Sequence, residues 1–282
     1  NGRMQRGSKQ NGKALSNTFV RRVHAVLQAA LKQAVKERLI PYNPCENCRI
    51  PPKDKKEMTI LPPEKIGRYL QEAEKYGVLP MFYLELSSGL RRGELLALHW
   101  EDLNVKERIL TVNKQVTRME GELDVTEPKT KNSIRSIPLI PNIASELQQW
   151  KNVQQNDAMT AGVAYQDSGF LVTNPFGGYL EPRTFKDAYD EILKASGLGH
   201  YTFHALRHTF ATRAIEQGMD AKTTSILLGH SSVSFTLDTY THVLDSQKQE
   251  KMKVMEEFFT LPDMPQVQSY AIAVTPMANG FL

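Results

Sequence analysis

The first part of the chain carries apolar residues at helical spacing. Ser16 is a suitable N-cap, and apolar side chains then recur with a helical period over residues 19–35. This pattern predicts an amphipathic helix. Arg21, Arg22 and Lys32 fall largely on the opposite side of that helix. Two interpretations of this basic side stay open, a solvated face and a face that lies on DNA phosphates.

A basic, proline-rich stretch over residues 41–57 follows the helix. It contains four prolines and a lysine cluster, a composition typical of linkers. We therefore predict a partial helical domain over residues 1–50, a basic linker over 51–58, a larger domain over 59–260 and a tail over 261–282. For the tail, docking on a neighbouring protomer and disorder both stay open. The polar start without an initiator Met suggests a piece cut from a longer chain.

The larger domain mixes helical and strand-like patterns. Helices are expected over residues 63–76, 80–88, 143–155, 182–196 and 245–259, and in the stretch 203–243. Strands are expected over 108–116, 123–127 and 133–139, with a short hairpin over 170–180. The pattern predicts a mainly α protein with a small antiparallel β-sheet.

Composition narrows the class of protein. The chain has 282 residues, of which 40% are hydrophobic and 23% charged, as in soluble globular proteins. The sequence has no apolar run long enough to cross a bilayer and no signal-peptide pattern at its start, so we expect no membrane partner. The formal net charge is +4, and basic residues concentrate in residues 1–57. This distribution permits nucleic-acid binding without requiring it.

Two patterns that could hold a metal are weak. Cys45 and Cys48 form a Cys-x-x-Cys pair, which could be half a metal site or a redox pair. We interpret them as two incidental thiols in a reducing cytoplasm, because no second ligand pair or strand–helix redox context accompanies them. His204 and His208 lie four residues apart, but no catalytic Glu adjoins His204. We expect no metal.

The stretch from Phe203 to Val243 holds the candidate chemistry. Breaking a phosphodiester without a metal requires several cations, a nucleophile and a proton donor, because one donor supplies only about 3–4 kcal/mol of the roughly 20 required. The planar fork of arginine can donate to both non-bridging oxygens. His204 and Arg207 share one helical face. Tyr240 could be a nucleophile if nearby cations favoured its phenolate and a histidine accepted its proton.

Five segments resemble, in order, the motifs of the tyrosine recombinase, or phage integrase, family. They are GLRRGEL at 89–95, PKTK at 128–131, HALRH at 204–208, LGHSS at 228–232 and TYTH at 239–242. The likeness covers most of residues 58–259, and its PKTK and NPFGG stretches most resemble integrases of conjugative transposons and temperate phages. It implies the catalytic domain of the family, preceded by a partial all-helical core-binding domain.

The resemblance implies roles for the basic residues of these motifs. Arg91 and Arg207 would clamp the scissile phosphate, and His230 would hydrogen-bond it. Glu94 occupies the acidic position of the family and would support the site. Arg92 adjoins Arg91, but the family pattern Gly-Leu-Arg-x-x-Glu selects Arg91. The histidines expected only to pack or to form hydrogen bonds are His99, His208 and His242.

The resemblance also implies how the reaction moves protons. Tyr240 would be the nucleophile and His204 would assist proton transfer. Lys129 would be the general acid toward the 5′ oxygen, with Lys131 close enough in sequence to compete for that role. The residues that we expect to contact DNA outside the chemistry are Arg21, Arg22, Lys32, Lys53, Lys55 and Lys131.

These assignments lead to a site-specific DNA recombinase that integrates and excises a mobile element through a 3′-phosphotyrosyl intermediate. The resemblance implies a cytoplasmic protein, bacterial or encoded by a mobile element. It also implies a homotetramer on double-stranded DNA, with accessory DNA-bending or excision factors as further partners, and no ATP or metal cofactor. Two alternatives stay open. A type IB topoisomerase would share the chemistry but religate the same strand. A non-catalytic DNA-binding accessory protein would keep only the fold.

Overall fold

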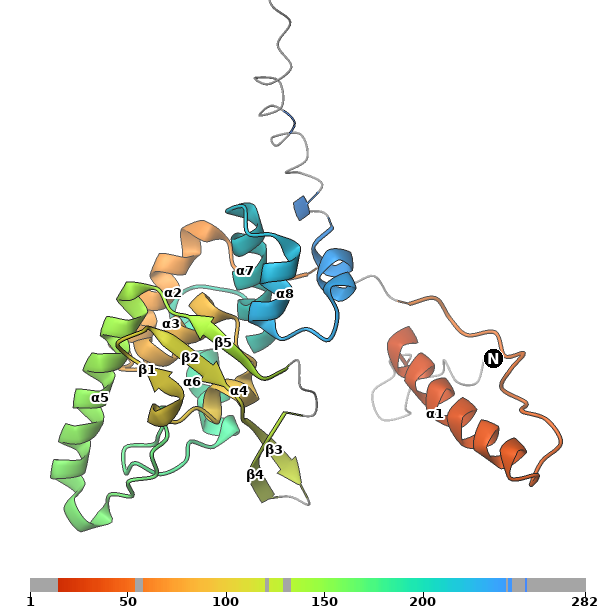
Figure 1. Cartoon of the computed structure of the whole chain (residues 1–282), viewed down its shortest axis with the longest axis horizontal. Coiled ribbons are helices and arrows are strands. Elements are labelled where there is room, and N and C mark those ends of the chain that lie inside the picture. The colour runs from red at the N-terminus through yellow and green to blue at the C-terminus, as the bar shows by residue number, and fades with distance from the viewer. Residues whose placement is uncertain are drawn as a thin grey trace, which may run out of the picture. The chain divides into compact units, whose positions relative to one another are not determined.

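The computed structural model describes residues 15–53, 58–119, 122–128, 133–241, 243–244 and 252. Two compact units divide the chain, Asn1–Met58 and Thr59–Leu282. Figure 1 shows the elements of both units, and each unit is described by itself. Across the described residues, no helix is both long and apolar enough to cross a membrane.

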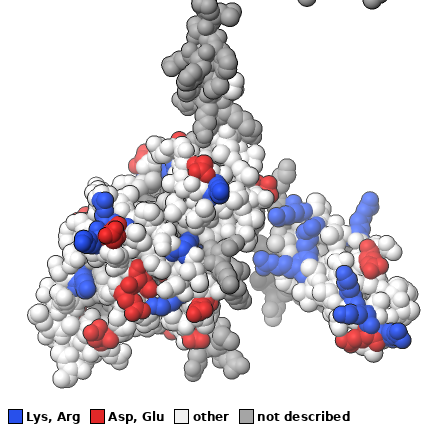
Figure 2. All heavy atoms as spheres, in the orientation of Figure 1, with Lys and Arg blue, Asp and Glu red and all other residues white. Residues whose placement is uncertain are grey.

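The first unit is built on helix α1 (Asn17–Lys36). The side chain of Ser16 caps the helix by accepting a hydrogen bond from the Phe19 amide at 3.2 Å. Arg21 donates to the carbonyl of Pro51 at 2.8 Å, which ties the following segment to the helix. Val20 and Asn43 are the only buried residues among those described in this unit. In the view of Figure 2, Lys and Arg side chains gather on this unit.

The larger unit is mainly helical, as the sequence pattern predicts. Its helices are α2 (Pro63–Lys75), α3 (Leu79–Ser88), α4 (Arg92–Leu96), α5 (Pro141–Ala161), α6 (Pro182–Ala195), α7 (Phe203–Glu216) and α8 (Ala221–Leu228), and residues 233–241 are also helical. Short 3-10 helices are η1 (Trp100–Asp102) and η3 (Gly162–Ala164). Helix α3 lies at the centre and contacts α2, α5 and α7 (Figure 1).

The apolar side of α3 explains its central position. Met81, Phe82, Leu84 and Leu86 are all buried, so this helix is covered on most of its surface. The ring of Phe82 stacks on Phe185 of α6 with centroids 5.0 Å apart. This core fixes α3, and with it the loop that follows at Gly89.

Two small antiparallel sheets complete the unit. The first has the order β1–β2–β5, formed by β1 (Leu103–Asn104), β2 (Ile109–Val112) and β5 (Arg135–Pro138). The second is a hairpin of β3 (Gln115–Met119) and β4 (Glu122–Thr126). Within the described residues, the expected hairpin at 170–180 reduces to a bridge between Thr173 and Tyr179 and a second bridge from Phe170 to His99.

The prediction of one strand over residues 108–116 is wrong. Leu110 and Val112 of β2 are buried against the core, whereas the chain leaves that sheet at Lys114, whose ammonium group pairs with Glu101 at 2.8 Å. It then packs on α4, where a Cβ on Gly93 would lie 2.8 Å from the Val116 carbonyl. The alternating pattern continues through the break because the residues on both sides of it form strands. The two strands belong to different sheets.

The helix expected at 245–259 lies outside the described residues except for Met252, which is helical. The tail 261–282 lies outside them entirely.

Candidate active site

Three arginines converge on the C-terminal end of α8. Arg135 donates from Nε to the carbonyl of Leu227 at 2.6 Å. Arg207 and Arg91 donate from Nη2 to the two following carbonyls, of Leu228 at 2.6 Å and of Gly229 at 3.1 Å. The last carbonyls of a helix lack partners within the helix and carry partial negative charge. The end of α8 therefore provides acceptors that offset part of the repulsion among three guanidinium groups.

Glycines shape the backbone around this cluster. Gly229 ends α8 in the left-handed region at a φ of 64°, and Gly89 ends α3 at the same φ. The Gly89 carbonyl accepts a hydrogen bond from Arg207 at 2.8 Å. A Cβ on Gly89 would lie 2.7 Å from the ring of Phe210 and 2.8 Å from Leu228. Only glycine fits both the conformation and the space at this position.

Arg207 is 2% exposed and lies on α7. Burial and, next, the charge of Arg91 lower its pKa to about 9, although Glu94 and Tyr240 act in the opposite direction. At neutral pH the guanidinium group is still charged. Arg207 is therefore a buried cation with carbonyl partners and without a carboxylate hydrogen-bonded to it among the described residues.

Glu94 joins the other two arginines. Its carboxylate accepts from Arg91 at 2.7 Å and forms a two-pronged pair with Arg135 at 3.1 and 2.9 Å. It also accepts from the Arg91 amide at 2.8 Å, which caps α4. Burial favours a higher pKa for Glu94, but the hydrogen bonds and charges of Arg135 and Arg91 outweigh it and hold the pKa below its usual value. Glu94 is therefore ionised and holds Arg91 and Arg135 in place.

Arg135 was missed by the sequence analysis. It lies on β5, where Arg135 and Ile137 are both buried and the intervening Ser136 is exposed. A charged residue on the apolar face of an expected strand was the available signal, since such a residue requires a buried partner. Its partner, Glu94, lies 41 residues earlier in the chain.

Three histidines lie around the arginine cluster. His204 and His208 both lie on α7, and their ring centroids are 4.6 Å apart. His230 follows α8, and its Nδ1 lies 2.7 Å from the hydroxyl of Thr236. Burial, with the positive charge of Arg207 as the next cause, lowers the pKa of His230 to about 3. Partial loss of water also lowers the pKa of His204, as do Arg207 and Arg91. These rings are neutral at neutral pH.

Tyr240 is buried in this structure. It lies on the helical residues 233–241 with 1% of its surface exposed, and its hydroxyl is 3.0 Å from Nδ1 of His208. Burial raises the pKa of Tyr240 to about 12, against the opposing charge of Arg207. The phenol is therefore protonated. The sequence analysis gave the proton-transfer role to His204, whereas the histidine that contacts this hydroxyl is His208.

The remaining predicted residues are placed unevenly. Lys129, Lys131 and Lys55 lie outside the described residues. The predicted DNA contacts Arg22, Lys32 and Lys53 are exposed on the first unit, and Arg21 is half-buried there. The structure thus brings together Arg91, Glu94, His204, Arg207, His230 and Tyr240 with the additional Arg135 and His208.

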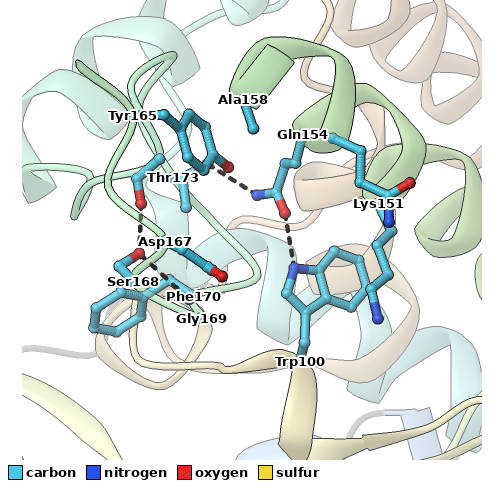
Figure 3. Close-up of a pocket in the computed structure, with 12 residues that line it drawn as sticks. Trp100, Lys151, Gln154, Ala158, Tyr165, Asp167, Ser168, Gly169, Phe170 and Thr173 are labelled. Carbon is cyan, nitrogen blue, oxygen red and sulfur yellow. Dashed lines mark hydrogen bonds between the residues drawn. The ribbon is translucent and has the colours of Figure 1, made fainter. Parts of the chain in front are cut away.

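A second hollow in the larger unit is a poor candidate for chemistry. It has a volume of about 240 Å³ and lies between α5 and the segment 165–177 (Figure 3). Its central polar groups bond to one another. Gln154 accepts from Trp100 at 2.7 Å and donates to Thr173 at 2.9 Å. These hydrogen bonds hold the loop 165–177 against α5 and leave the arginine cluster as the candidate active site.

Comparison with known proteins identifies the class to which this fold and site belong. Residues 60–247 match the family model described as the phage integrase family. This match covers more than half of the chain, so the chain belongs to the phage integrase family of tyrosine recombinases. It is a site-specific recombinase, which confirms the resemblance, the fold class and the type of enzyme expected from the sequence.

Two bacterial relatives support this placement. The chain is 32% identical over 268 residues to the "Tyrosine recombinase XerC-like" protein of Caldanaerobacter subterraneus subsp. tengcongensis, which covers 89% of this chain and 68% of the relative. It is 29% identical to the ICEBs1 integrase of Bacillus subtilis, over 86% of this chain and 66% of that protein. The chain therefore spans about two thirds of the length of these relatives.

Solved structures share the fold. The Tn1549 transposon integrase in complex with transposon right end DNA superimposes with a TM-score of 0.71, at 24% identity over 86% of this chain and 80% of that chain. A lambda integrase tetramer bound to a Holliday junction gives a TM-score of 0.56, at 22% identity over 77% of this chain and 58% of that chain.

Proposed function

We propose that this recombinase cuts and rejoins DNA strands through a 3′-phosphotyrosyl bond to Tyr240, in the integration and excision of a mobile element. The observation that carries the proposal is the cluster of three arginines, of which Arg91 and Arg135 bond the carboxylate of Glu94 whereas Arg207 bonds backbone carbonyls. Such a cluster has an excess of positive charge beside a candidate nucleophile. A phosphodiester is an anion whose transition state gathers more negative charge on its oxygens, so it suits this site.

In the proposed reaction, Arg91 and Arg207 donate to the non-bridging oxygens of the scissile phosphate. Each guanidinium group has five N–H donors, and only some of them are used by the carbonyls of α8 and Gly89. Arg135 bonds the other side of Glu94 and acts as a positioning residue for Arg91. His230 donates a further hydrogen bond to the phosphate.

The bonds then change in two steps. The Tyr240 oxygen attacks the phosphorus, its proton passes to a histidine, and the bond from phosphorus to the 5′ oxygen breaks while Lys129 supplies a proton to that oxygen. The 5′ hydroxyl of a partner strand next attacks the phosphotyrosyl bond and releases Tyr240. The bond energy is kept in the covalent intermediate, so no high-energy cofactor is required.

Tyr240 must move before it can react. Its hydroxyl bonds His208 and its side chain is almost fully buried. We propose that assembly of a homotetramer on two double-stranded DNA sites releases it. Complexes of related integrases with DNA, including a tetramer on a Holliday junction, support this assembly.

Strand exchange tests this function. Two labelled duplexes that carry the joined ends of the element are incubated with the protein, and four-way junctions and recombinant strands are separated by electrophoresis. The proposal expects both products with the native chain and neither with Tyr240→Phe. Relaxation of supercoiled DNA without exchange would instead indicate a topoisomerase-like activity.

Lys129 has its own test. Lys129→Ala should slow cleavage of a normal 5′ oxygen by at least about 100-fold, since that is the usual contribution of a general acid. A 5′-thio leaving group needs no proton, so its cleavage should change little. Equal slowing of both substrates would remove Lys129 from the acid role and make Lys131 the next residue to test.

A further inference from the structure

The first unit contains a cluster of metal-ligating side chains that the reaction does not use. His24 of α1 lies beside Cys45 and Cys48, and the ligand atoms of all three are within 4.8 Å of one another. Among the described residues, this is the only group of three or more His, Cys, Asp or Glu side chains close enough to hold a metal ion. The sequence analysis saw only the cysteine pair, because His24 precedes it by 21 residues.

The spacing suits a small, soft ion. Zinc binds Cys sulfur at about 2.3 Å and His nitrogen at about 2.0–2.1 Å in a tetrahedron, which places neighbouring ligand atoms roughly 3.3–3.8 Å apart. Atoms already within 4.8 Å reach that geometry by small side-chain rotations. Two sulfurs and one imidazole favour zinc over magnesium or calcium, which take oxygen ligands.

The backbone holds these ligands together without a metal. The buried side chain of Asn43 donates to the carbonyl of Gln28 on α1 at 3.2 Å and accepts from the Cys45 amide at 2.9 Å. His24 bonds the Cys45 carbonyl at 3.2 Å. Hydrogen bonds from a ligating histidine to a carbonyl commonly orient the ring in metal sites. The loop is therefore preorganised against the helix.

The site is open to solvent, since His24 and Cys45 are half-buried and Cys48 is exposed. The three side chains line a hollow of about 530 Å³ together with Arg21, Arg22, Glu46 and Lys53. Two thiolates and a divalent ion sum to zero charge, so the same basic residues do not repel the occupied site.

The first unit also has few buried side chains to stabilise it. Val20 and Asn43 are its only buried residues among those described, and small units with thin cores commonly rely on a metal. Binding of a structural zinc ion contributes directly to folding.

We propose that His24, Cys45 and Cys48 bind a zinc ion that fastens the segment after α1 to the helix. Water or the carboxylate of Glu46 would take the fourth position. The ion is structural, because it lies in the first unit and the candidate active site is built entirely from the second. The proposal does not depend on the recombination mechanism.

Metal binding to the whole chain tests the proposal. The protein is purified under reducing conditions, given zinc, dialysed, and weighed by native mass spectrometry. We expect one zinc ion per chain. Cobalt in place of zinc should give the intense thiolate-to-cobalt absorption band, and Cys48→Ser should weaken or abolish it. His24→Ala should lower zinc affinity by at least about tenfold, since even outer partners of metal ligands contribute that much.

His200→Ala is the matched control, because His200 is an exposed histidine of the larger unit and its loss should leave zinc affinity unchanged. Retention of no zinc by a fully reduced chain would overturn the proposal. Equal affinities of the His24 and His200 variants would also overturn it. So would an intact mass showing that Cys45 and Cys48 form a disulfide in the zinc-loaded, reduced sample.

Discussion

The pairing of Arg135 with Glu94 is more deeply buried than the pairing of Arg91 with the same carboxylate. Both side chains are buried and the carboxylate accepts two hydrogen bonds from the guanidinium group. Removing one partner of such a pair leaves an uncompensated charge away from water. The sequence motifs point to Glu94 and not to Arg135, because the pairing exists only after β5 folds beside α4.

Arg135→Ala should therefore destabilise the protein by about 3–5 kcal/mol, the usual effect of breaking a buried ion pair. Urea denaturation measures the change in the free energy of unfolding. Lys186→Ala is the matched control, since its partner Asp190 is an exposed residue on the same helix, and it should change stability by less than about 1 kcal/mol. Similar losses of stability in the two variants would show that the buried pair of Arg135 and Glu94 contributes no more than an exposed one.

The buried histidines make stability depend on pH. Burial, assisted by His204 and Arg207, lowers the pKa of His208 to about 4, below the value near 6.5 of an unfolded histidine. A folded-state pKa that is lowered in this way means that the unfolded chain binds protons first as the pH falls. The contribution of His208 to stability is complete above about pH 6.5 and is lost progressively toward about pH 4. His230 acts in the same direction.

His208→Asn tests this pH dependence. Asparagine can still exchange a hydrogen bond with the Tyr240 hydroxyl but does not titrate. The urea concentration at the unfolding midpoint of the native chain should decrease as the pH is lowered from about 7 to about 5. The same midpoint of the variant should decrease less. An unchanged slope in the variant would assign the pH dependence to other groups.

At the scale of elements, the site depends on where helices end. Helices α3 and α8 both stop at a left-handed glycine, and their last carbonyls meet the arginines of α7 and α4. A glycine after an apolar helical run is visible in the sequence. The contact between two helix ends more than a hundred residues apart is a product of packing, and no local pattern shows it.

Gly89→Ala should lower the free energy of unfolding by more than backbone strain alone would. A left-handed alanine costs about 1–2 kcal/mol, and overpacking against Phe210 and Leu228 adds about 1–3 kcal/mol. Gly77→Ala is the control, because Gly77 is also left-handed at a φ of 71° but has open space around its Cβ position. Urea denaturation of both variants separates strain from packing. Equal losses would show that packing at Gly89 adds nothing.

Element boundaries also show where pattern reasoning works. Helix start and stop signals, namely the prolines at the starts of these helices and Gly89 after α3, place α2, α3 and α6 within a few residues of their observed ends. The alternating pattern joins β2 and β3 into one strand, because alternation is the same on both sides of Lys114 and the change of sheet depends on contacts with α4 and Glu101.

At the scale of the whole molecule, the candidate site gathers residues from α4, α7, β5 and the helical segment 233–241. The motif order makes Arg91, Arg207, His230 and Tyr240 predictable as a set. It does not predict that Tyr240 is buried and bonded to His208, because this depends on how the last described helix packs on α7. DNA and neighbouring protomers would have to change this packing before Tyr240 could react.

The proposed reaction requires that Tyr240 become covalently bound to DNA at the arginine cluster. A nicked suicide duplex that carries an end of the element tests it most directly, because the short 5′ fragment diffuses away after cleavage and the protein stays attached. Denaturing electrophoresis, followed by mass spectrometry of the nucleotide-bearing peptide, identifies the linked residue. We predict an adduct at Tyr240 in the native chain and none with Tyr240→Phe. An adduct of undiminished yield in the Phe variant would show that Tyr240 is not the nucleophile.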